Sequence, residues 1–193
     1  VRDEELRLTV ETNGLLCTPE IAGELARCVQ PAVSVSIDGA DADTHEEIRG
    51  VPGCFEAAKG AVVNLVAAGL EPQIVFTVMR RNAGQLAAMV ELGERLGAAS
   101  MKFNVVQPTA RGKGLHERGL TVGVEELLDL GRYVDSELAP QTHLTLFFDV
   151  PLAFLPLRRI ATGEGCGVCR IRGILGVLAT GHYALCGIGE QVP

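Results

Sequence analysis

The sequence predicts an α/β fold built on a parallel sheet, in the form of a partial (β/α) barrel or barrel sector. Short apolar, β-branched stretches alternate with amphipathic helical stretches at spacings of roughly 25 to 40 residues, as in successive right-handed β-α-β units. The chain of 193 residues is 47% hydrophobic but only 4% aromatic and contains no Trp, so Val, Leu, Ile and Ala must build the core. A chain of this length is expected to form one domain, or one domain with a small appendage.

The central element of this pattern is residues 32–39, AVSVSIDG, a predicted strand that ends in a polar tip. Its β-favouring residues form a near-continuous apolar run, which predicts a strand buried on both faces, as in parallel sheets. Residues 6–11 alternate apolar and polar side chains and predict an earlier strand that runs into a turn. Thr18 is expected to cap the intervening helix, with Pro19 at its first position, and Pro31 is expected to end it.

The elements that follow continue the alternation. We expect, in order, a short helix capped by Thr44, a helix over 55–69, a strand over 73–79, a helix from Asn82 to a left-handed cap at Gly97, and a strand over 101–106. After these, we expect a polar loop over 110–119, a helix capped by Thr121 and an isolated strand over 144–148.

The composition then shifts towards Gly and Cys, which predicts a domain boundary. We predict a partial barrel core over residues 1–162 and a small Cys-containing region over residues 163–193, with a β-hairpin around Thr180-Gly181. Four or five strands make an incomplete barrel, and the chain starts almost on its first strand. It is therefore expected to be part of something larger.

Charge and hydropathy argue against several function classes. The formal net charge is −7 and the sequence pI is about 5.1, which argues against a nucleic-acid surface. No apolar run reaches the ~18 residues of a membrane span, and no signal peptide is evident. We therefore expect a cytoplasmic protein that binds neither nucleic acid nor a membrane.

Polar side chains follow the predicted strands at the points where these end. They are Thr12, Asn13 and Gly14 after the first strand, Ser36 and Asp38 at the end of the second, Thr77 to Arg80 after the third, and Asn104 to Pro108 after the fourth. The carboxyl ends of parallel strands meet at one edge, where α/β proteins bind ligands. With Arg49 as a fork for a carboxylate, these groups predict a site for a polar ligand that carries a carboxylate and a ribose. The alternative is that each group only caps a turn or a helix.

The six cysteines form two groups. A C-x2-C pair with a third thiolate from a Gly hairpin can hold one metal, as zinc or an iron–sulfur cluster. Because only three thiolates gather, the site is expected to be open or to take its fourth ligand from outside this chain. The alternative is that the cysteines are buried structural residues, which we expect for the scattered group. The gathered group is Cys166, Cys169 and Cys186, and the scattered group is Cys17, Cys28 and Cys54.

These motifs resemble those of radical S-adenosylmethionine (SAM) enzymes with the start of a SPASM domain. The likeness rests on T-N-G at 12–14, S-I-D-G at 36–39, H-E-E-I-R-G at 45–50 and A-R-G-K-G at 110–114. Its most specific part is Cys169 followed by eleven residues, Gly181, four residues and Cys186, which matches the opening half of the SPASM cysteine motif. The resemblance covers nearly the whole chain.

The resemblance implies a partial (β/α)6 barrel whose strand ends hold SAM beside a [4Fe–4S] cluster. By this resemblance, Thr12 and Ser36 would contact the methionine or ribose part of SAM. Arg49 would pair with the SAM carboxylate, and the backbone of Val106 would lie near the adenine. The implied ligands of an auxiliary [4Fe–4S] cluster are Cys169 and Cys186, with Cys166 as an extra or alternative ligand.

Two motifs of that family are missing from this sequence: the C-x3-C-x2-C motif that would bind the SAM cluster, and a Gly-Gly-Glu motif on a preceding strand. Both precede T-N-G in the family, so the chain is expected to begin at the third barrel strand. The later SPASM cysteines are missing as well. We therefore expect that this chain by itself does not cleave SAM.

The leading hypothesis from the sequence is a radical SAM/SPASM enzyme that modifies a ribosomally made peptide or a protein side chain. Its chemistry would be reductive cleavage of SAM to a radical that abstracts hydrogen from the substrate, with an electron donor such as flavodoxin or ferredoxin. Maturation of haem or another tetrapyrrole is the alternative within the same chemistry. The alternative from another class is a non-catalytic α/β binding domain with a zinc knuckle.

Overall fold

The computed structural model describes residues 6–108, 111–149, 157–162, 176–177 and 181–184. The chain divides into two compact units. One consists of residues 1–106 and 121–150, and the other of residues 107–120 and 151–193. The domain boundary predicted between residues 162 and 163 stays a prediction.

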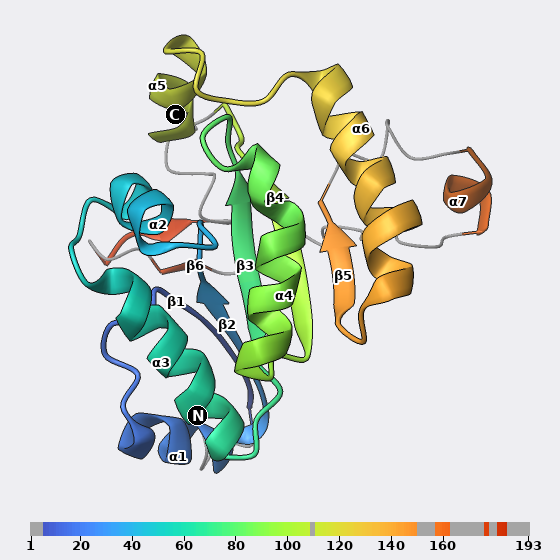
Figure 1. The fold of residues 1–193 in the computed structure, drawn as a ribbon. Helices are drawn as coiled ribbons and strands as arrows, with labels where there is room; N and C mark the ends of the chain where they lie inside the picture. Colours follow the sequence, from blue (N-terminus) through green and yellow to red (C-terminus); the bar gives the residue numbers. More distant parts are fainter. Residues whose placement is uncertain (1–5, 109–110, 150–156, 163–175, 178–180, 185–193) are drawn as a thin grey trace. The chain divides into compact units, whose positions relative to one another are not determined.

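The first unit is built on a sheet of five strands in the order β1-β2-β3-β4-β5 (Figure 1). All neighbouring pairs are parallel, and a helix lies in each connection. This is the arrangement of a barrel sector, so the predicted α/β fold with a partial parallel barrel is confirmed. The strands are β1 (Arg7–Thr12), β2 (Val29–Ser36), β3 (Gln73–Val78), β4 (Ser100–Val105) and β5 (Thr145–Phe148).

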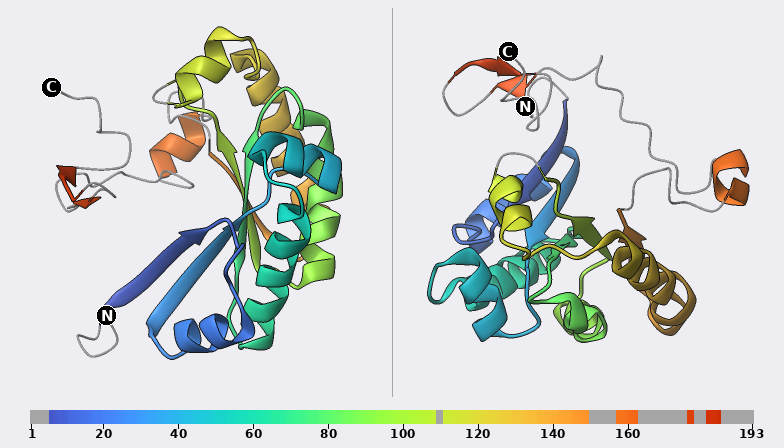
Figure 2. Two further views of the ribbon diagram at one scale, coloured as in Figure 1. Left: turned by 90° about the vertical axis from the view of Figure 1, so that its left-hand side faces the viewer. Right: turned by 90° about the horizontal axis from the view of Figure 1, so that it is seen from above.

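A layer of helices covers one face of this sheet, where α3, α4 and α6 lie on the same side (Figure 2). The helices of the first unit are α1 (Pro19–Ala26), α2 (Ala42–Arg49), α3 (Cys54–Ala67), α4 (Leu86–Leu96) and α6 (Val124–Tyr133). A 3-10 turn over Ala83–Gln85 precedes α4, and a π-helical turn over Val134–Leu138 and a 3-10 turn over Ala139–Gln141 follow α6.

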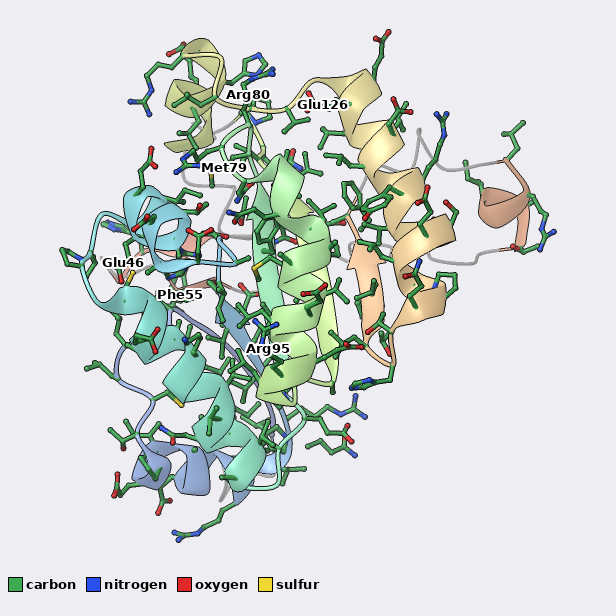
Figure 3. All side chains as sticks on the ribbon, in the orientation of Figure 1. Glu46, Phe55, Met79, Arg80, Arg95 and Glu126 are labelled. Atoms are coloured by element: carbon green, nitrogen blue, oxygen red, sulfur yellow. The ribbon has the colours of Figure 1, made fainter. Side chains whose placement is uncertain are left out.

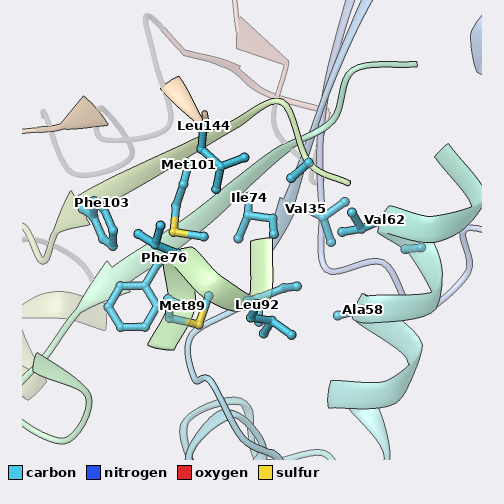
Figure 4. Packing of buried hydrophobic residues seen from close by; sticks show 14 of the residues in the cluster. Val35, Ala58, Val62, Ile74, Phe76, Met89, Leu92, Met101, Phe103 and Leu144 are labelled. Atoms are coloured by element: carbon cyan, nitrogen blue, oxygen red, sulfur yellow. The ribbon is translucent and has the colours of Figure 1, made fainter. Parts of the chain in front are cut away.

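The core lies between these helices and the sheet face that they cover (Figure 4). Phe103 has no exposed surface in this core. Its ring makes an edge-to-face contact with Phe76, at 5.8 Å between centroids, and lies 6.1 Å from the ring of Phe148. Burying an aromatic or branched side chain of this size stabilises the fold by about 1.5–3 kcal/mol. Other strand residues buried in this core are Val33, Val35, Ile74, Val78 and Met101.

The opposite face of the sheet is polar, which corrects the prediction that residues 32–39 are buried on both faces. In β2 the buried Val33 and Val35 alternate with the partly exposed Ser34 and Ser36. The alternation is hard to see in the sequence because serine is small and the residues between are all β-branched. Register, and not composition, decides that only one side of this strand meets the core.

Polar side chains run across this second face from strand to strand. The Ser34 hydroxyl lies 3.4 Å from Gln73 Oε1, and Gln73 Nε2 donates to the Ser100 hydroxyl at 3.1 Å. Parallel sheets are ordinarily covered on both faces by apolar elements. A second face of this composition is therefore suited to line a space that holds water or a ligand, as the inside of a barrel mouth does.

Pro31, which was expected to end the first helix, lies inside β2 instead. The pairing of β1 with β2 shifts at this point, because Arg7 pairs with Val29 but Thr9 pairs with Ala32. β2 thus has one extra residue there. Such a bulge is one of the few places where a strand accepts proline, which has no N–H to give to the ladder.

Two of the predicted helix caps are confirmed and one is displaced. The Thr18 hydroxyl accepts from the Ile21 N–H at 3.4 Å, and Gly97 ends α4 in the left-handed conformation, with φ of 76°. α2 begins after Asp41, whose carboxylate accepts from the Thr44 N–H at 2.8 Å. Thr44 therefore lies inside the helix that it was expected to cap.

Two further predicted caps are wrong. α6 follows Gly123 with no side-chain cap, so Thr121 does not start it. α4 starts after Gln85, and the Asn82 side chain binds strand ends rather than helix N–H groups. A short polar residue in a connection satisfies whichever unpaired backbone group is nearest, and its spacing to a helix does not reveal which group that is.

Two further stretches differ from expectation: one that was predicted as a loop is helical, and one that was predicted as an isolated strand joins the sheet. Within the expected loop over 110–119, the second unit contains α5 (Arg111–Glu117), in which Lys113 and Glu117 form an i,i+4 ion pair at 3.9 Å. The strand expected to be isolated over 144–148 is β5, which pairs with β4 along its whole length.

The other described elements of the second unit are α7 (Leu157–Thr162) and an antiparallel pair of β6 (Gly176–Val177) with β7 (Tyr183–Ala184). This pair confirms the hairpin predicted around Thr180-Gly181. The predicted metal ligands Cys166, Cys169 and Cys186 lie outside the described residues. In the parts of the chain that the structure describes, no helix combines the length and apolar character needed to cross a membrane.

The two-faced sheet can be tested with two phenylalanines on neighbouring strands. Phe103→Ala is expected to lower the free energy of unfolding by about 3–5 kcal/mol, because it empties a fully buried site. Phe147→Ala is the matched control: its ring is 47% exposed, and we expect a loss of about 1 kcal/mol or less. Denaturant unfolding followed by circular dichroism measures both, and equal losses would contradict this assignment of faces.

Candidate functional site

The carboxylate of Asp38 joins three elements at the carboxyl end of the sheet. Asp38 follows β2 and is only 2% exposed. Its Oδ1 accepts from the Thr77 N–H of β3 at 2.8 Å, and its Oδ2 lies 2.6 Å from Nη2 of Arg49 at the end of α2. Burying a lone carboxylate is costly, and a charge-assisted pair with short hydrogen bonds offsets that cost. Asp38 therefore fixes the ends of β2 and β3 and the position of α2.

The fully buried Asn82 makes the second connection between the same two strands. Its Nδ2 donates to the carbonyl oxygens of Asp38 and Thr77, both at 2.9 Å, and its Oδ1 accepts from the Met79 N–H at 2.7 Å. This role of Asn82 was not predicted from the sequence. The available signal was an asparagine close behind a strand, where an amide can serve both an unpaired N–H and an unpaired C=O.

The loop between β2 and α2 packs closely against the backbone of α2 and is also hydrogen-bonded by the side-chain amide of Gln85. A Cβ on Gly39 would lie 2.5 Å from the His45 backbone nitrogen, so the S-I-D-G motif needs a glycine at this position. Gln85 Oε1 accepts from the Ala40 N–H at 2.9 Å, and its Nε2 donates to the Thr44 hydroxyl at 3.0 Å.

His45 is buried beneath this loop and is 1% exposed. Its Nδ1 accepts from the Asp38 N–H at 2.9 Å, which requires that nitrogen to be unprotonated. Burial lowers the pKa of His45, an effect that the Asp38 carboxylate opposes and the Arg49 guanidinium reinforces. The centroid of the His45 ring lies 5.7 Å from that of the Phe55 ring. The backbone N–H of Phe55 donates to the Glu46 carboxylate at 3.4 Å and so fixes the corner between α2 and α3 (Figure 3).

Ser36, Thr77 and Asn104 lie together on the polar face of the sheet, near its carboxyl end. Ser36 pairs with Val75, and Thr77 pairs with Asn104. Within the described part of the chain, Asn104 Oδ1 is buried without a hydrogen-bond partner, and the Ser36 hydroxyl makes no side-chain hydrogen bond. An acceptor left unsatisfied in this way costs about 1–3 kcal/mol, which a ligand with a suitable donor would recover. Asn104 was predicted only as part of a strand end.

Thr12 lies at the same edge as Ser36 but points to the other face. It pairs with Val35, whose side chain is buried against the helices. The Thr12 hydroxyl accepts from the Gly14 N–H at 3.1 Å, and Asn13 caps the same turn through its Oδ1. Both residues thus have the turn-capping partners that the sequence left open as an alternative, and their contact with a ligand stays a prediction.

Arg49 keeps one unused donor beside its ion pair with Asp38. Its Nε is buried and has no hydrogen-bond partner among the residues that the structure describes. A ligand carboxylate at this point would supply the missing acceptor. Val106, which directly follows β4 at the same edge, is half-buried, and its predicted contact with an adenine stays a prediction.

No three His, Cys, Asp or Glu side chains gather as a metal site within the ranges described. Cys17 and Cys54 are buried, as predicted for the scattered cysteines, and burial raises the pKa of both thiols. Cys28 is partly exposed, which corrects the expectation for that residue.

The buried His45 predicts a specific pH dependence of stability. Because its pKa is lower in the folded protein than in the unfolded chain, the unfolded chain binds more protons below about pH 6.5. Stability is therefore lost as the pH falls from the unfolded-state pKa towards the folded-state pKa. His45→Gln removes this contribution, so between pH 7 and 5 the variant should lose less stability than the wild type in denaturant unfolding.

His143→Gln is the control, because the side chain of His143 is 73% exposed and its pair with Glu94, at 3.3 Å, is screened by solvent. It should retain the wild-type pH dependence. If the free energy of unfolding of His45→Gln falls with pH as steeply as that of the wild type, the protonation of His45 does not limit stability in this range.

Comparison with known proteins gives this site a context. Residues 1–92 match the model of the radical SAM superfamily. The AdoMet-dependent heme synthase of Methanosarcina barkeri is 41% identical over 110 residues, which are 57% of this chain and 32% of that protein. The AdoMet-dependent heme synthase of Nitratidesulfovibrio vulgaris is 32% identical over 200 residues, 99% of this chain and 53% of that protein. Mycofactocin maturase MftC of Mycobacterium tuberculosis is 39% identical over 102 residues, 52% of this chain and 26% of that protein.

The chain thus spans about half the length of the N. vulgaris relative and less of the other two. Solved structures share the fold, and two of them illustrate it. Native anSMEcpe with bound AdoMet matches with a TM-score of 0.66 at 14% identity, over 95% of this chain and 51% of that one. Streptococcus suis SuiB bound to S-adenosylmethionine matches with a TM-score of 0.64 at 15% identity, over 79% of this chain and 34% of that one. The family match over residues 1–92 and the curated relatives show that this chain carries a radical SAM domain, and the two solved structures share its fold.

Proposed function

We propose that the protein containing this chain is a radical SAM enzyme that matures haem or a related tetrapyrrole. The extent of the matches carries this proposal. The heme synthase of N. vulgaris aligns with 99% of the chain, whereas MftC aligns with 52% of it. The sequence alone placed a peptide substrate first, and the wider match to the heme synthase favours the tetrapyrrole.

The polar groups at the strand ends fit SAM. Its amino acid part carries a carboxylate, and its ribose carries hydroxyl groups that both donate and accept. Arg49 Nε, a donor without a partner among the described residues, suits the carboxylate. Asn104 Oδ1, an acceptor that also lacks a partner there, suits a hydroxyl. Ser36 offers a further hydroxyl on the same face as Asn104. When bound together with a [4Fe–4S] cluster, SAM supplies the radical chemistry of the superfamily.

The residues of this chain would orient that ligand rather than react with it. Asp38 holds Arg49 in place through its Oδ2, so the guanidinium is positioned before any ligand binds. Asn82 and the Asp38 Oδ1 fix the spacing of β2 and β3, and with it the distance between Ser36 and Thr77. Such preorganisation reduces the cost of ordering the site on binding.

Several predictions from the resemblance enter this proposal unchanged. Contacts of Thr12, Asn13 and the Val106 backbone with SAM belong to it, as do an auxiliary [4Fe–4S] cluster, an electron donor such as flavodoxin or ferredoxin, and a cytoplasmic location. The proposed ligands of the auxiliary cluster are Cys169 and Cys186, with Cys166 as an extra or alternative ligand.

A second candidate is the modification of a peptide or protein side chain. It is favoured by the 39% identity to the maturase MftC over 102 residues. Both candidates require SAM cleavage, and they differ in the molecule that stimulates it.

The proposal is tested with the full-length protein purified without oxygen. We expect iron and sulfide in the protein, and 5′-deoxyadenosine from SAM and dithionite, formed faster when an iron porphyrin with carboxylate side chains is added. Zinc as the sole metal would favour the non-catalytic binding domain. Stimulation by a peptide and not by the porphyrin would favour the second candidate.

Ser36 and Ser34 provide a matched test of the SAM site, since they lie on the same strand and face. Ser36→Ala is expected to weaken SAM binding about fivefold, the loss of one hydrogen bond of ~1 kcal/mol. Ser34→Ala is the control, because its hydroxyl bonds to Gln73 farther from the carboxyl end. Isothermal titration of the full-length protein with SAM measures both. Equal effects of the two changes would argue against the proposed placement of SAM.

A further inference from the structure

Lys102 and Phe147 lie next to each other on the polar face of the sheet. They are paired in register between β4 and β5. Lys102 stands between Met101 and Phe103, which are buried on the helix-covered face, and Phe147 precedes Phe148, whose ring packs on that same core. Because side chains alternate along a strand, Lys102 and Phe147 both point away from the helices.

The fold itself gives no reason for this pair. Lysine is depleted in strands, and Lys102 lies between the buried Val75 on one side and Phe147 on the other, where an apolar residue would pack better. Phe147 leaves 47% of its surface exposed beside this charge. A large, half-exposed aromatic ring and a cation that lie side by side on a mostly polar face are typical of a binding surface.

Lys102 has a counter-ion that a ligand can replace. Its Nζ lies 3.3 Å from Oδ2 of Asp149, which follows β5. The two side chains are 36% and 59% exposed, and an ion pair with this much solvent contact contributes little to stability. A carboxylate on a ligand can therefore take the place of Asp149 at low cost.

We propose that Lys102 and Phe147 bind the substrate, as a site for a flat aromatic ring system that carries a carboxylate. The ring lies against Phe147 and the carboxylate pairs with the ammonium of Lys102 in place of Asp149. This inference rests on the proposed function and names the groups that select its substrate, since a tetrapyrrole of the haem class is a flat macrocycle with propionate side chains.

The position of the pair suits this role. Lys102 precedes Asn104 by two residues on the same strand, so the two side chains are neighbours on the same face of the sheet. Asn104 carries the buried acceptor that was assigned above to SAM and that has no partner in the described part of the chain. A substrate held by Lys102 and Phe147 thus lies next to the proposed cofactor, as hydrogen abstraction requires.

Binding of haemin to the full-length protein tests this inference without measuring activity. Absorbance titration in the Soret region gives the dissociation constant for haemin, which has two propionates, and for its dimethyl ester, which has none. Lys102→Met should weaken haemin binding about tenfold and leave binding of the ester unchanged. Lys102→Arg, which keeps the charge, should remain within about threefold of the wild type.

Asp149→Asn should act in the opposite direction. It frees Lys102 from its counter-ion, so haemin should bind two- to threefold more tightly, a change that a merely structural residue would not produce. Lys59→Met is the matched control, because Lys59 also pairs with a carboxylate, at 2.7 Å, but lies on α3. It should leave both dissociation constants unchanged. Phe147→Ala should weaken the binding of haemin and of the ester alike.

The outcomes separate this inference from the function on which it rests. Haemin binding that is equal in the wild type and Lys102→Met, or unchanged in Asp149→Asn, would overturn the inference even if the wild type cleaves SAM. A wild-type protein that forms no 5′-deoxyadenosine would overturn the proposed function, whatever the variants bind.

Discussion

The site depends on one buried carboxylate, that of Asp38. It lies where β2 ends, and it meets a backbone N–H of β3 and the guanidinium of Arg49 at the end of α2. A charge at 2% exposure is tolerated only with such partners, so the three elements hold one another in place. Gly39 and Asn82 support the same junction, the first by allowing α2 to approach and the second by binding both strand ends.

A second constraint is that the parallel sheet has two different faces. One face is built from Val, Ile, Met and Phe and packs against the helices, whereas the other carries serine, threonine, asparagine and lysine. The apolar face contributes most of the stability. The polar face contributes little to it and is free to bind ligands, which is why the groups assigned to SAM and to substrate all lie at the carboxyl end of the sheet or on this face.

Predictions from the sequence agree with the structure where the interacting residues are close in the chain, and fail where they are far apart. The cap at Thr18 and the left-handed Gly97 were predicted correctly, because each involves residues within one helical turn. The helix cap at Thr44 was wrong by three residues, since Asp41 caps the helix instead and accepts from the N–H of Thr44. The role of Asn82 was missed because its partners, Asp38 and Thr77, come from two strands that only the fold brings together.

By itself, the sequence determined the alternation of strands and helices, the α/β class and the motifs shared with the radical SAM superfamily, because periodicity and spacing are local properties of the chain. Only the tertiary structure decided which polar residues meet. It directed Thr12 and Ser36 to opposite faces, paired Arg49 with Asp38 and placed Lys102 beside Phe147. Side-chain direction in a sheet follows strand register, which is fixed by the packing of the whole core and not by any one segment.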